Sequence, residues 1–367
     1  MRKGWEYKKL GEVCTLISDG SHNPPKGIDH SLYRMISSQN VFDDNLQITE
    51  DNVRYITESD HLCENKRTKL QKDVVLLTIV GTIGRSCVLK GNEGCLTLQR
   101  SVAALHPSDQ IMPRYLMHCL IGNRHTLNQE AHGIAQKGIY LKQLSSLSIP
   151  LPPKSTQLAI VSELDKINEL IRLKKEQLKD FDNLAQSLFY EMFGDPVENE
   201  MGWNKMKWKD VLTIINGKNQ SAVVDENGDY PIYGSGGIMG YANNWLCPEK
   251  CTIIGRKGNI NKPIFVESKF WNVDTAFGLK PNIEILSPRF LFYFCLNYNF
   301  ERHNKAVTIP SLTKADLLKI DIPLPPLPLQ RLFAQRIEQI EREKSEVQKS
   351  IQDLETLLAS RMQYWFE

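Results

Sequence analysis

Long hydrophobic runs are missing from this sequence of 367 residues. Apolar stretches such as Phe290–Leu296 are far shorter than the ~18 residues that a membrane-spanning helix needs. The first residues, Met-Arg-Lys-Gly-Trp, carry charge with no apolar segment behind them, so we expect no signal peptide. The composition, with 41% hydrophobic and 24% charged residues, excludes a disordered or fibrous chain and is typical of a globular protein.

Cysteine is sparse and irregularly spaced. Of the eight cysteines, only Cys247 and Cys251 lie close together, without a second Cys or His pair. This is weak evidence for zinc, so we predict no metal site and instead expect reduced thiols in a cytoplasmic protein. The sequence also lacks a large excess of charge of either sign, because its 45 Lys and Arg residues nearly balance its 43 Asp and Glu residues. A nucleic-acid partner would therefore have to be bound by local clusters of side chains.

Catalytic motifs are absent as well. Gly217-Lys218 is followed by Asn219, which excludes a Walker A loop, and neither H-E-x-x-H nor G-x-S-x-G occurs. The segment Asn23–Lys26, Asn-Pro-Pro-Lys, resembles the loop of adenine methyltransferases but ends in Lys where that chemistry needs an aromatic ring. The sequence therefore predicts no catalytic residue.

What the sequence does contain is an internal duplication. The segment Ile149–Pro153, Ile-Pro-Leu-Pro-Pro, recurs as Ile322–Pro326, and Gln157 matches Gln330 at the same offset. A repeat of this length indicates two copies of a whole domain and not a solenoid.

Each copy ends in this proline-rich stretch, which cannot be helical, and a long helical pattern follows. Apolar residues recur at alternating steps of four and three, which predicts two long helices with an a/d seam. Two ordinary surface helices are the alternative, which the length of each pattern disfavours. The predicted seam residues are Leu164, Ile167, Ile171, Leu178, Phe181, Leu188, Ile337, Ile340, Val347, Ile351, Leu354 and Leu358.

We therefore expect a duplicated α/β (α+β) fold. Because domains and helices alternate along the chain, the helices should pair antiparallel, separate the two globular domains and give pseudo-twofold symmetry. Asp73–Val80 and Cys251–Ile254 are predicted as buried strands, and Pro113 and Pro288 as helix starts. The expected parts are a first domain at residues 1–153, a first helix at 154–194, a second domain at 195–326 and a second helix at 327–367.

Polar side chains suited to DNA lie on the predicted loops of both domains. Arg and Lys donate to guanine or to phosphate, and Asn and Gln can bracket the edge of an adenine. For any one of them, a solvated loop residue is the alternative. The candidates in the first domain are Ser21, His22, Asn23, Gln39, Asn40, Thr82, Arg85 and Arg100. The candidates in the second domain are Asn219, Gln220, Ser235, Arg256, Lys257, Asn259, Asn261 and Lys262.

Several further motifs join the two Ile-Pro-Leu-Pro-Pro junctions. They are the repeated openings Trp5–Val13 and Trp203–Val211, and the segments Leu188–Pro196, Tyr233–Tyr241 and Phe270–Phe277. With these motifs, the sequence resembles the specificity (S) subunits of type I restriction–modification systems over nearly the whole chain. The resemblance implies two target-recognition domains that each read half of a split DNA site, with the long helices as spacer and docking surface.

The resemblance further implies a non-catalytic subunit of a multisubunit restriction endonuclease and DNA adenine methyltransferase. Its implied partners are double-stranded DNA, two modification subunits and the restriction or translocase subunits. S-adenosylmethionine, ATP and Mg are expected on those partner subunits only. A bivalent protein- or RNA-binding adaptor and a stand-alone nuclease or methyltransferase are the competing functions.

Overall fold

The computed structural model describes residues 5–133, 137–304, 306 and 308–366. The chain divides into two compact units, which we call unit 1 (Met1–Leu173 with Ile351–Glu367) and unit 2 (Lys174–Ser350). Residues 1–4 and 134–136 of the first predicted domain, 305 and 307 of the second, and 367 of the second predicted helix lie outside the described residues. Among the described residues, no helix combines the length and apolar character that crossing a bilayer requires.

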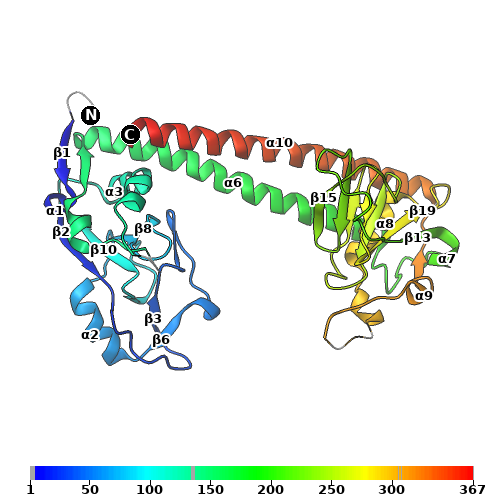
Figure 1. Cartoon of the computed structure of the whole chain (residues 1–367), viewed down its shortest axis with the longest axis horizontal. Helices are drawn as coiled ribbons and strands as arrows, with labels where there is room; N and C mark the ends of the chain where they lie inside the picture. The colour runs from blue at the N-terminus through cyan, green and yellow to red at the C-terminus, as the bar shows by residue number, and fades with distance from the viewer. Residues whose placement is uncertain (1–4, 134–136, 305, 307, 367) are drawn as a thin grey trace. The chain divides into compact units, whose positions relative to one another are not determined.

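Unit 1 is built around a four-stranded antiparallel sheet with the order β2-β10-β7-β8. A second sheet has the order β6-β3-β9, in which β3 and β9 run parallel. Strands β3 and β6 of this sheet are labelled in Figure 1. The strands are β1 (Glu6–Lys9), β2 (Cys14–Asp19), β3 (Tyr33–Ile36), β4 (Val41–Phe42), β5 (Asn45–Leu46), β6 (Arg54–Ile56), β7 (Val75–Thr78), β8 (Ser86–Val88), β9 (Cys95–Leu98), β10 (Val102–Pro107) and β11 (Ser148–Leu151). The short helices are α1 (Leu10–Val13), η1 (Glu50–Asn52), α2 (Glu58–Thr68), α3 (Pro113–Gly122), α4 (Arg124–Gln129) and α5 (Leu141–Ser146).

Unit 2 repeats the strand order of both of these sheets, and the short β4–β5 ladder of unit 1 has no counterpart among the described residues of unit 2. Its four-stranded sheet has the order β13-β19-β16-β17, and its second sheet has the order β15-β14-β18 with β14 and β18 parallel. The strands are β12 (Lys205–Lys207), β13 (Leu212–Asn216), β14 (Tyr230–Gly234), β15 (Gly237–Ala242), β16 (Cys251–Gly255), β17 (Ile264–Val266), β18 (Trp271–Asn272), β19 (Ala276–Pro281) and β20 (Asp321–Pro323). The short helices are α7 (Trp208–Val211), α8 (Pro288–Asn297), η2 (Phe300–His303) and α9 (Lys314–Leu317). The duplicated mixed α/β fold expected from the sequence is thus confirmed.

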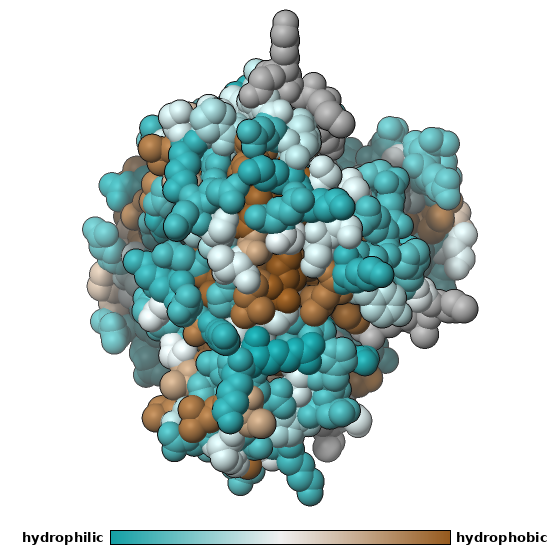
Figure 2. All heavy atoms as spheres, turned by 90° about the vertical axis from the view of Figure 1, so that its left-hand side faces the viewer, coloured by the Kyte–Doolittle hydropathy of each residue, from teal (hydrophilic) through white to brown (hydrophobic). Residues whose placement is uncertain are grey.

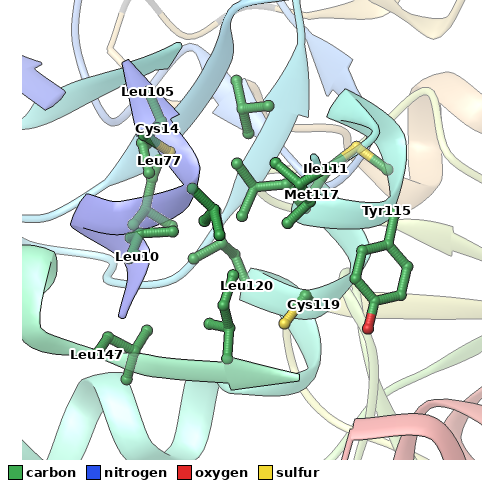
Figure 3. Packing of buried hydrophobic residues seen from close by; sticks show 14 of the residues in the cluster. Leu10, Cys14, Leu77, Leu105, Ile111, Tyr115, Met117, Cys119, Leu120 and Leu147 are labelled. Atoms are coloured by element: carbon green, nitrogen blue, oxygen red, sulfur yellow. The ribbon is translucent and has the colours of Figure 1, made fainter. Parts of the chain in front are cut away.

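Each unit buries its own hydrophobic core. In unit 1, Tyr115 and Leu120 of α3 pack on Leu77 and Leu105 of the sheet (Figure 3). Helix α3 begins at Pro113, where the missing backbone N–H of proline costs nothing. The ring of Tyr115 is fully buried, and its hydroxyl donates to the Pro150 carbonyl at 2.9 Å, so a polar group that burial would otherwise penalise is paired.

All eight cysteines are described, and each is a free thiol. Cys247 and Cys251 are buried, and burial raises the pKa of the Cys251 thiol to about 12. The Cys247 thiol donates to Asn272 Oδ1 at 3.1 Å. Within the described part of the chain, no three His, Cys, Asp or Glu side chains are grouped to hold a metal ion.

Two helices of 40 residues each complete the fold: α6 (Lys154–Phe193) and α10 (Leu327–Phe366). They correspond to the helices predicted at 154–194 and 327–367, and the division between the units falls within both of them. Each of the twelve predicted seam residues is buried or half-buried. The pattern of apolar residues therefore marks the face of each helix that turns away from solvent.

The helices run antiparallel within each unit. In unit 2, Lys344 of α10 donates to Asp182 of α6, and Phe333 of α10, farther back along its chain, packs on Phe189, farther forward along α6. In unit 1, Arg361 and Trp365 of α10 both donate to Glu163 of α6, the indole at 3.0 Å. The hydrogen bond from Arg361 lowers the pKa of the Glu163 carboxyl.

In each unit, a buried glutamine joins the globular part to its long helix. Gln157 of α6 and Gln330 of α10 are fully buried. Gln157 accepts from the Met112 N–H at 2.9 Å and donates to the carbonyl of Pro152 at 2.9 Å. Gln330 accepts from the Ser287 N–H at 2.8 Å and donates to the carbonyl of Pro325 at 2.8 Å. The duplication at these positions therefore has a structural reason, since an apolar residue there would leave backbone groups unpaired.

An arginine at the second position of α3 and of α8 makes a further link to the long helix. Arg114 donates to Asp165 of α6 at 2.5 Å and to Asp44, between β4 and β5, at 2.9 Å. In unit 2, Arg289 donates to Glu341 of α10 at 2.7 Å and also to Glu267. Each arginine therefore fixes one end of its domain on the helix beside it.

Candidate nucleic-acid interface

The strand order of unit 1 brings its candidate loops to one edge of the sheet. Strand β10 runs antiparallel to β2 and to β7, so its first residue, Val102, lies at the same edge as the last residues of β2 and β7, Asp19 and Thr78. Strand β3 likewise ends beside the end of β9. At its other end, β10 leads to Met112, which is bonded to Gln157 of α6. All eight candidates of the first domain therefore lie in loops that follow strand ends. The loop residues next to Arg85 are also joined to α6, because Asp44 bonds Ser86 and Arg114, and Arg114 bonds Asp165.

Unit 2 has the same arrangement. Strand β19 runs antiparallel to β13 and β16, and the parallel strands β14 and β18 end side by side. The loops that follow β13, β14 and β16 carry all eight candidates of the second domain. The loop after β13 comes so close to the end of β18 that a Cβ on Gly217 would lie 1.8 Å from the Val273 carbonyl oxygen. Only glycine fits at this approach.

Five candidates of unit 1 are exposed: His22, Asn23, Gln39, Thr82 and Arg100. A sixth, Arg85, is half-buried, with its guanidinium 4.6 Å from the centre of the Phe42 ring.

Two candidates of unit 1 do not qualify for contact with DNA. Asn40 is fully buried, accepts from the Ser37 N–H at 2.9 Å and donates to the Asn52 carbonyl at 3.0 Å. Ser21 is buried, and its hydroxyl donates to Glu64 at 3.0 Å. Both side chains hold their loops in shape. The prediction that Asn40 and Ser21 contact DNA is therefore wrong, and their role is structural.

Four candidates of unit 2 are exposed, namely Asn219, Lys257, Asn259 and Lys262, and three are half-buried, namely Gln220, Ser235 and Arg256. Arg256 lies with its guanidinium 5.7 Å from the centre of the Phe277 ring. The turn that carries Lys257 reverses at Gly258, which has φ +81°, a conformation that residues with a Cβ rarely adopt.

Asn261 is exposed, but its amide is used within the protein. Its Oδ1 accepts from the Phe300 N–H at 2.7 Å, and its Nδ2 donates to Asn299 at 3.1 Å. The side chain ties the turn after β16 to the start of η2. The Asn261 amide therefore holds this turn in place and is not free to bracket a base.

The structure adds residues that the loop pattern did not reveal. A hollow of about 490 Å³ in unit 1 is lined by Asp19, His22, Arg67 and Arg100 together with apolar residues such as Ile79. The face drawn in Figure 2 is mostly hydrophilic and surrounds an apolar patch near its centre. Arg67 comes from α2, far along the chain from Asp19, so no local motif could have connected the two.

Known proteins share both the sequence pattern and this fold. A family model described as the type I restriction modification DNA specificity domain matches residues 2–180 and 200–356. A putative type I restriction enzyme MjaX specificity subunit of Methanocaldococcus jannaschii is 23% identical, over 96% of this chain and 92% of that protein. The type I restriction enzyme EcoBI specificity subunit of Escherichia coli is 26% identical, over 44% of this chain and 34% of that protein.

Solved structures agree with this match. The S subunit of a type I restriction–modification system from M. genitalium superimposes with a TM-score of 0.61 at 15% identity, over 99% of this chain and 96% of that one. A chain from a structural study of the assembly and conformational transition of the type I R-M system gives a TM-score of 0.62 at 18% identity, over 100% of this chain and 98% of that one. At these identities the likeness concerns the fold.

Proposed function

Because the chain belongs to the type I restriction–modification DNA specificity family, we propose that it recognises a DNA target in two halves, one read by each unit. Members of this family supply sequence specificity, and catalysis belongs to other subunits. The observation that carries the proposal is that the four-stranded and three-stranded sheets of unit 1 recur in unit 2 with the same strand order, while the loops that leave them differ. Equivalent scaffolds with different loops suit two different half-sites.

The exposed loop residues have the chemistry that reading DNA requires. Arg100, Lys257 and Lys262 offer cationic donors to guanine or phosphate, and Asn23 and Asn259 offer amides to adenine. Each of these residues lies in a loop that follows the end of a sheet strand. Rigid strands with exposed polar loops hold such donors at fixed spacing, which base recognition needs.

The long helices serve the partner subunits in this proposal. Leu170 and Leu173 of α6 in unit 1 are 47% and 46% exposed, and Leu184 of α6 in unit 2 is 51% exposed. Leu170 and Leu173 are three positions apart and so share one face of α6, and neighbouring apolar side chains in solvent suit a protein interface. We assign these faces to the modification subunits, two in number, and through them to the restriction or translocase subunits. S-adenosylmethionine, ATP and Mg would be bound by those subunits.

Selection from a random duplex DNA pool tests the proposal. The purified full-length chain, with its modification subunits present, should enrich two constant blocks separated by a spacer without base preference. Affinity should fall steeply with salt, as expected when cationic side chains displace counterions from phosphates. Enrichment of one continuous block would contradict the two-reader account. Equal binding of all duplexes, with preference for RNA or a protein, would favour the adaptor function instead.

Removing Lys257 or Lys262 should weaken binding on every duplex sequence. Both ammonium groups are exposed on the turn after β16, where they can reach phosphates. For each variant, K257A and K262A, the slope of log affinity against log salt should fall by about one. Lys349 on α10 is equally exposed and away from the loops, so K349A is the matched control and should leave the slope unchanged. Wild-type slopes in both loop variants would remove this turn from the DNA contact.

A further inference from the structure

We propose that Arg67, held in place by Asp19, reads a guanine in the half-site bound by unit 1. The inference rests on the proposed function and deepens it, because it assigns one base to one side chain. It also adds two residues that the loop pattern did not include. The argument begins with the burial of Asp19.

Asp19 is the last residue of β2, and its side chain is only 8% exposed. A carboxylate in that position is costly unless it is paired. It has two partners, the guanidinium of Arg67 and His22 Nε2, the latter at 2.7 Å. Both partners are about half exposed, at 50% and 56%. A buried carboxylate thus orients two donors that face solvent at the loop edge of the sheet.

The end of α2 that carries Arg67 is fixed by neighbouring bonds. Glu64, one turn before Arg67, accepts from the Ser21 hydroxyl at 3.0 Å. The Thr68 carbonyl, directly after Arg67, is 2.8 Å from His106 Nε2 on β10. The base of the Arg67 side chain is therefore attached to the sheet on both sides. The Arg67 side chain is thus held at its backbone and, through Asp19, at one edge of its guanidinium, so it loses little conformational entropy when it binds.

The surroundings favour a base over a phosphate. Arg67 and Asp19 line the hollow of about 490 Å³ together with His22 and Arg100, and its other walls include the apolar side chains Ile79, Val80 and Ile139. A phosphate contact needs only a solvated cation and gains nothing from apolar walls. Reading a base edge needs a guanidinium of fixed orientation, and Arg donating to guanine O6 and N7 is the commonest specific contact in the major groove. The Asp19 charge also offsets the general attraction of Arg67 to phosphates.

The equivalent place in unit 2 carries different groups. Strand β13 ends at Asn216, followed by Gly217 and Asn219, where β2 ends at Asp19, followed by Gly20 and His22. In unit 1, α2 lies between β6 and β7, whereas no helix lies between the corresponding strands of unit 2, β15 and β16, among the described residues. The guanine contact is therefore a property of unit 1 alone.

The test uses the target that the wild-type chain selects and the variants R67A and R67K. R67A should lose about 5- to 150-fold in affinity for that target and should accept all four bases at one position of one half-site. The other half-site should keep its sequence. R67K keeps a positive charge beside Asp19 but lacks the guanidinium that can donate two hydrogen bonds to one base, so it should lose the same base preference. K66A, at the neighbouring exposed residue of α2, is the control and should select the wild-type sequence.

Replacing that guanine by 7-deazaguanine removes the N7 acceptor. The replacement should weaken binding by the wild-type chain and have no effect on R67A, since the interaction is already lost. D19N should relax the same position with a smaller loss of affinity, which identifies Asp19 as a positioning residue. If R67A and R67K both select the wild-type sequence, or if R67A weakens all sequences equally with a smaller salt slope, the inference is wrong. If the wild-type chain selects no two-part sequence, the proposed function itself fails.

Discussion

Inserting three heptads into each long helix should lengthen the preferred DNA spacer by about nine base pairs. The insertions follow Leu173 in α6 and Ser350 in α10, the positions where both helices pass from one unit to the other. Twenty-one helical residues add about 32 Å, close to the ~34–36 Å of one DNA turn, so the second half-site returns to nearly the same face of the duplex. Whole heptads keep the apolar seam in register.

The selected half-site sequences should stay as they are. Affinity for the original spacing should fall by at least about 100-fold, because the two units can no longer engage both half-sites at once. The same insertion in α10 alone displaces its seam against α6 and should abolish the preference for any fixed spacing. A folded double-insertion variant that still selects the original spacer would show that the helices do not set the distance.

Truncation of Phe189 should destabilise unit 2 by about 3–5 kcal/mol. The ring of Phe189 is fully buried where α6 meets α8 and α10. It lies 5.6 Å from the Phe290 ring and 5.7 Å from the Phe333 ring, measured between centroids. F189A would leave a cavity that the surrounding aromatic rings cannot fill without leaving their positions. Leu184, on the same helix but 51% exposed, is the matched control, and L184A should change the free energy of unfolding by no more than about 0.5 kcal/mol.

Urea unfolding and amide hydrogen exchange together check this result. In F189A, protection should fall for the amides of β13 and β19 in unit 2, and it should be unchanged for those of β2 and β10 in unit 1. An equal loss of protection in both units would contradict the division into two compact units. A loss below about 1 kcal/mol would show that the ring cluster is not the main attachment of α6 to unit 2.

Much of the fold could be predicted from the sequence because its signals are local or repeated. Helices α3 and α8 begin at the predicted prolines, Pro113 and Pro288, and the predicted strand Cys251–Ile254 is β16. Alternating steps of four and three marked the helix faces that are buried. The repeated Gln157 and Gln330 indicated equivalence, but their role depends on backbone groups that only the folded chain places beside them.

The site was harder to predict because exposure is decided by tertiary contacts. Asn40 and Asn261 are short polar side chains in loops, as a DNA-reading residue would be, yet both are bonded within the protein. Arg67, which we propose reads a base, could not be identified from the sequence at all. It sits on a polar helix with no motif around it, and only the fold brings it to Asp19 at the end of β2.

Exchange of one reading domain tests the central claim most directly. Residues 13–145 lie within unit 1 and contain its sheet and candidate loops. They would be replaced by the corresponding region of a related specificity subunit whose target is known. The measurement is the sequence that the hybrid selects from random duplex DNA, compared with both parents. The account predicts that one half of the hybrid's target is that of the donor protein. The other half and the spacer length should be those that this chain selects. A change in both halves, or in neither, would contradict it.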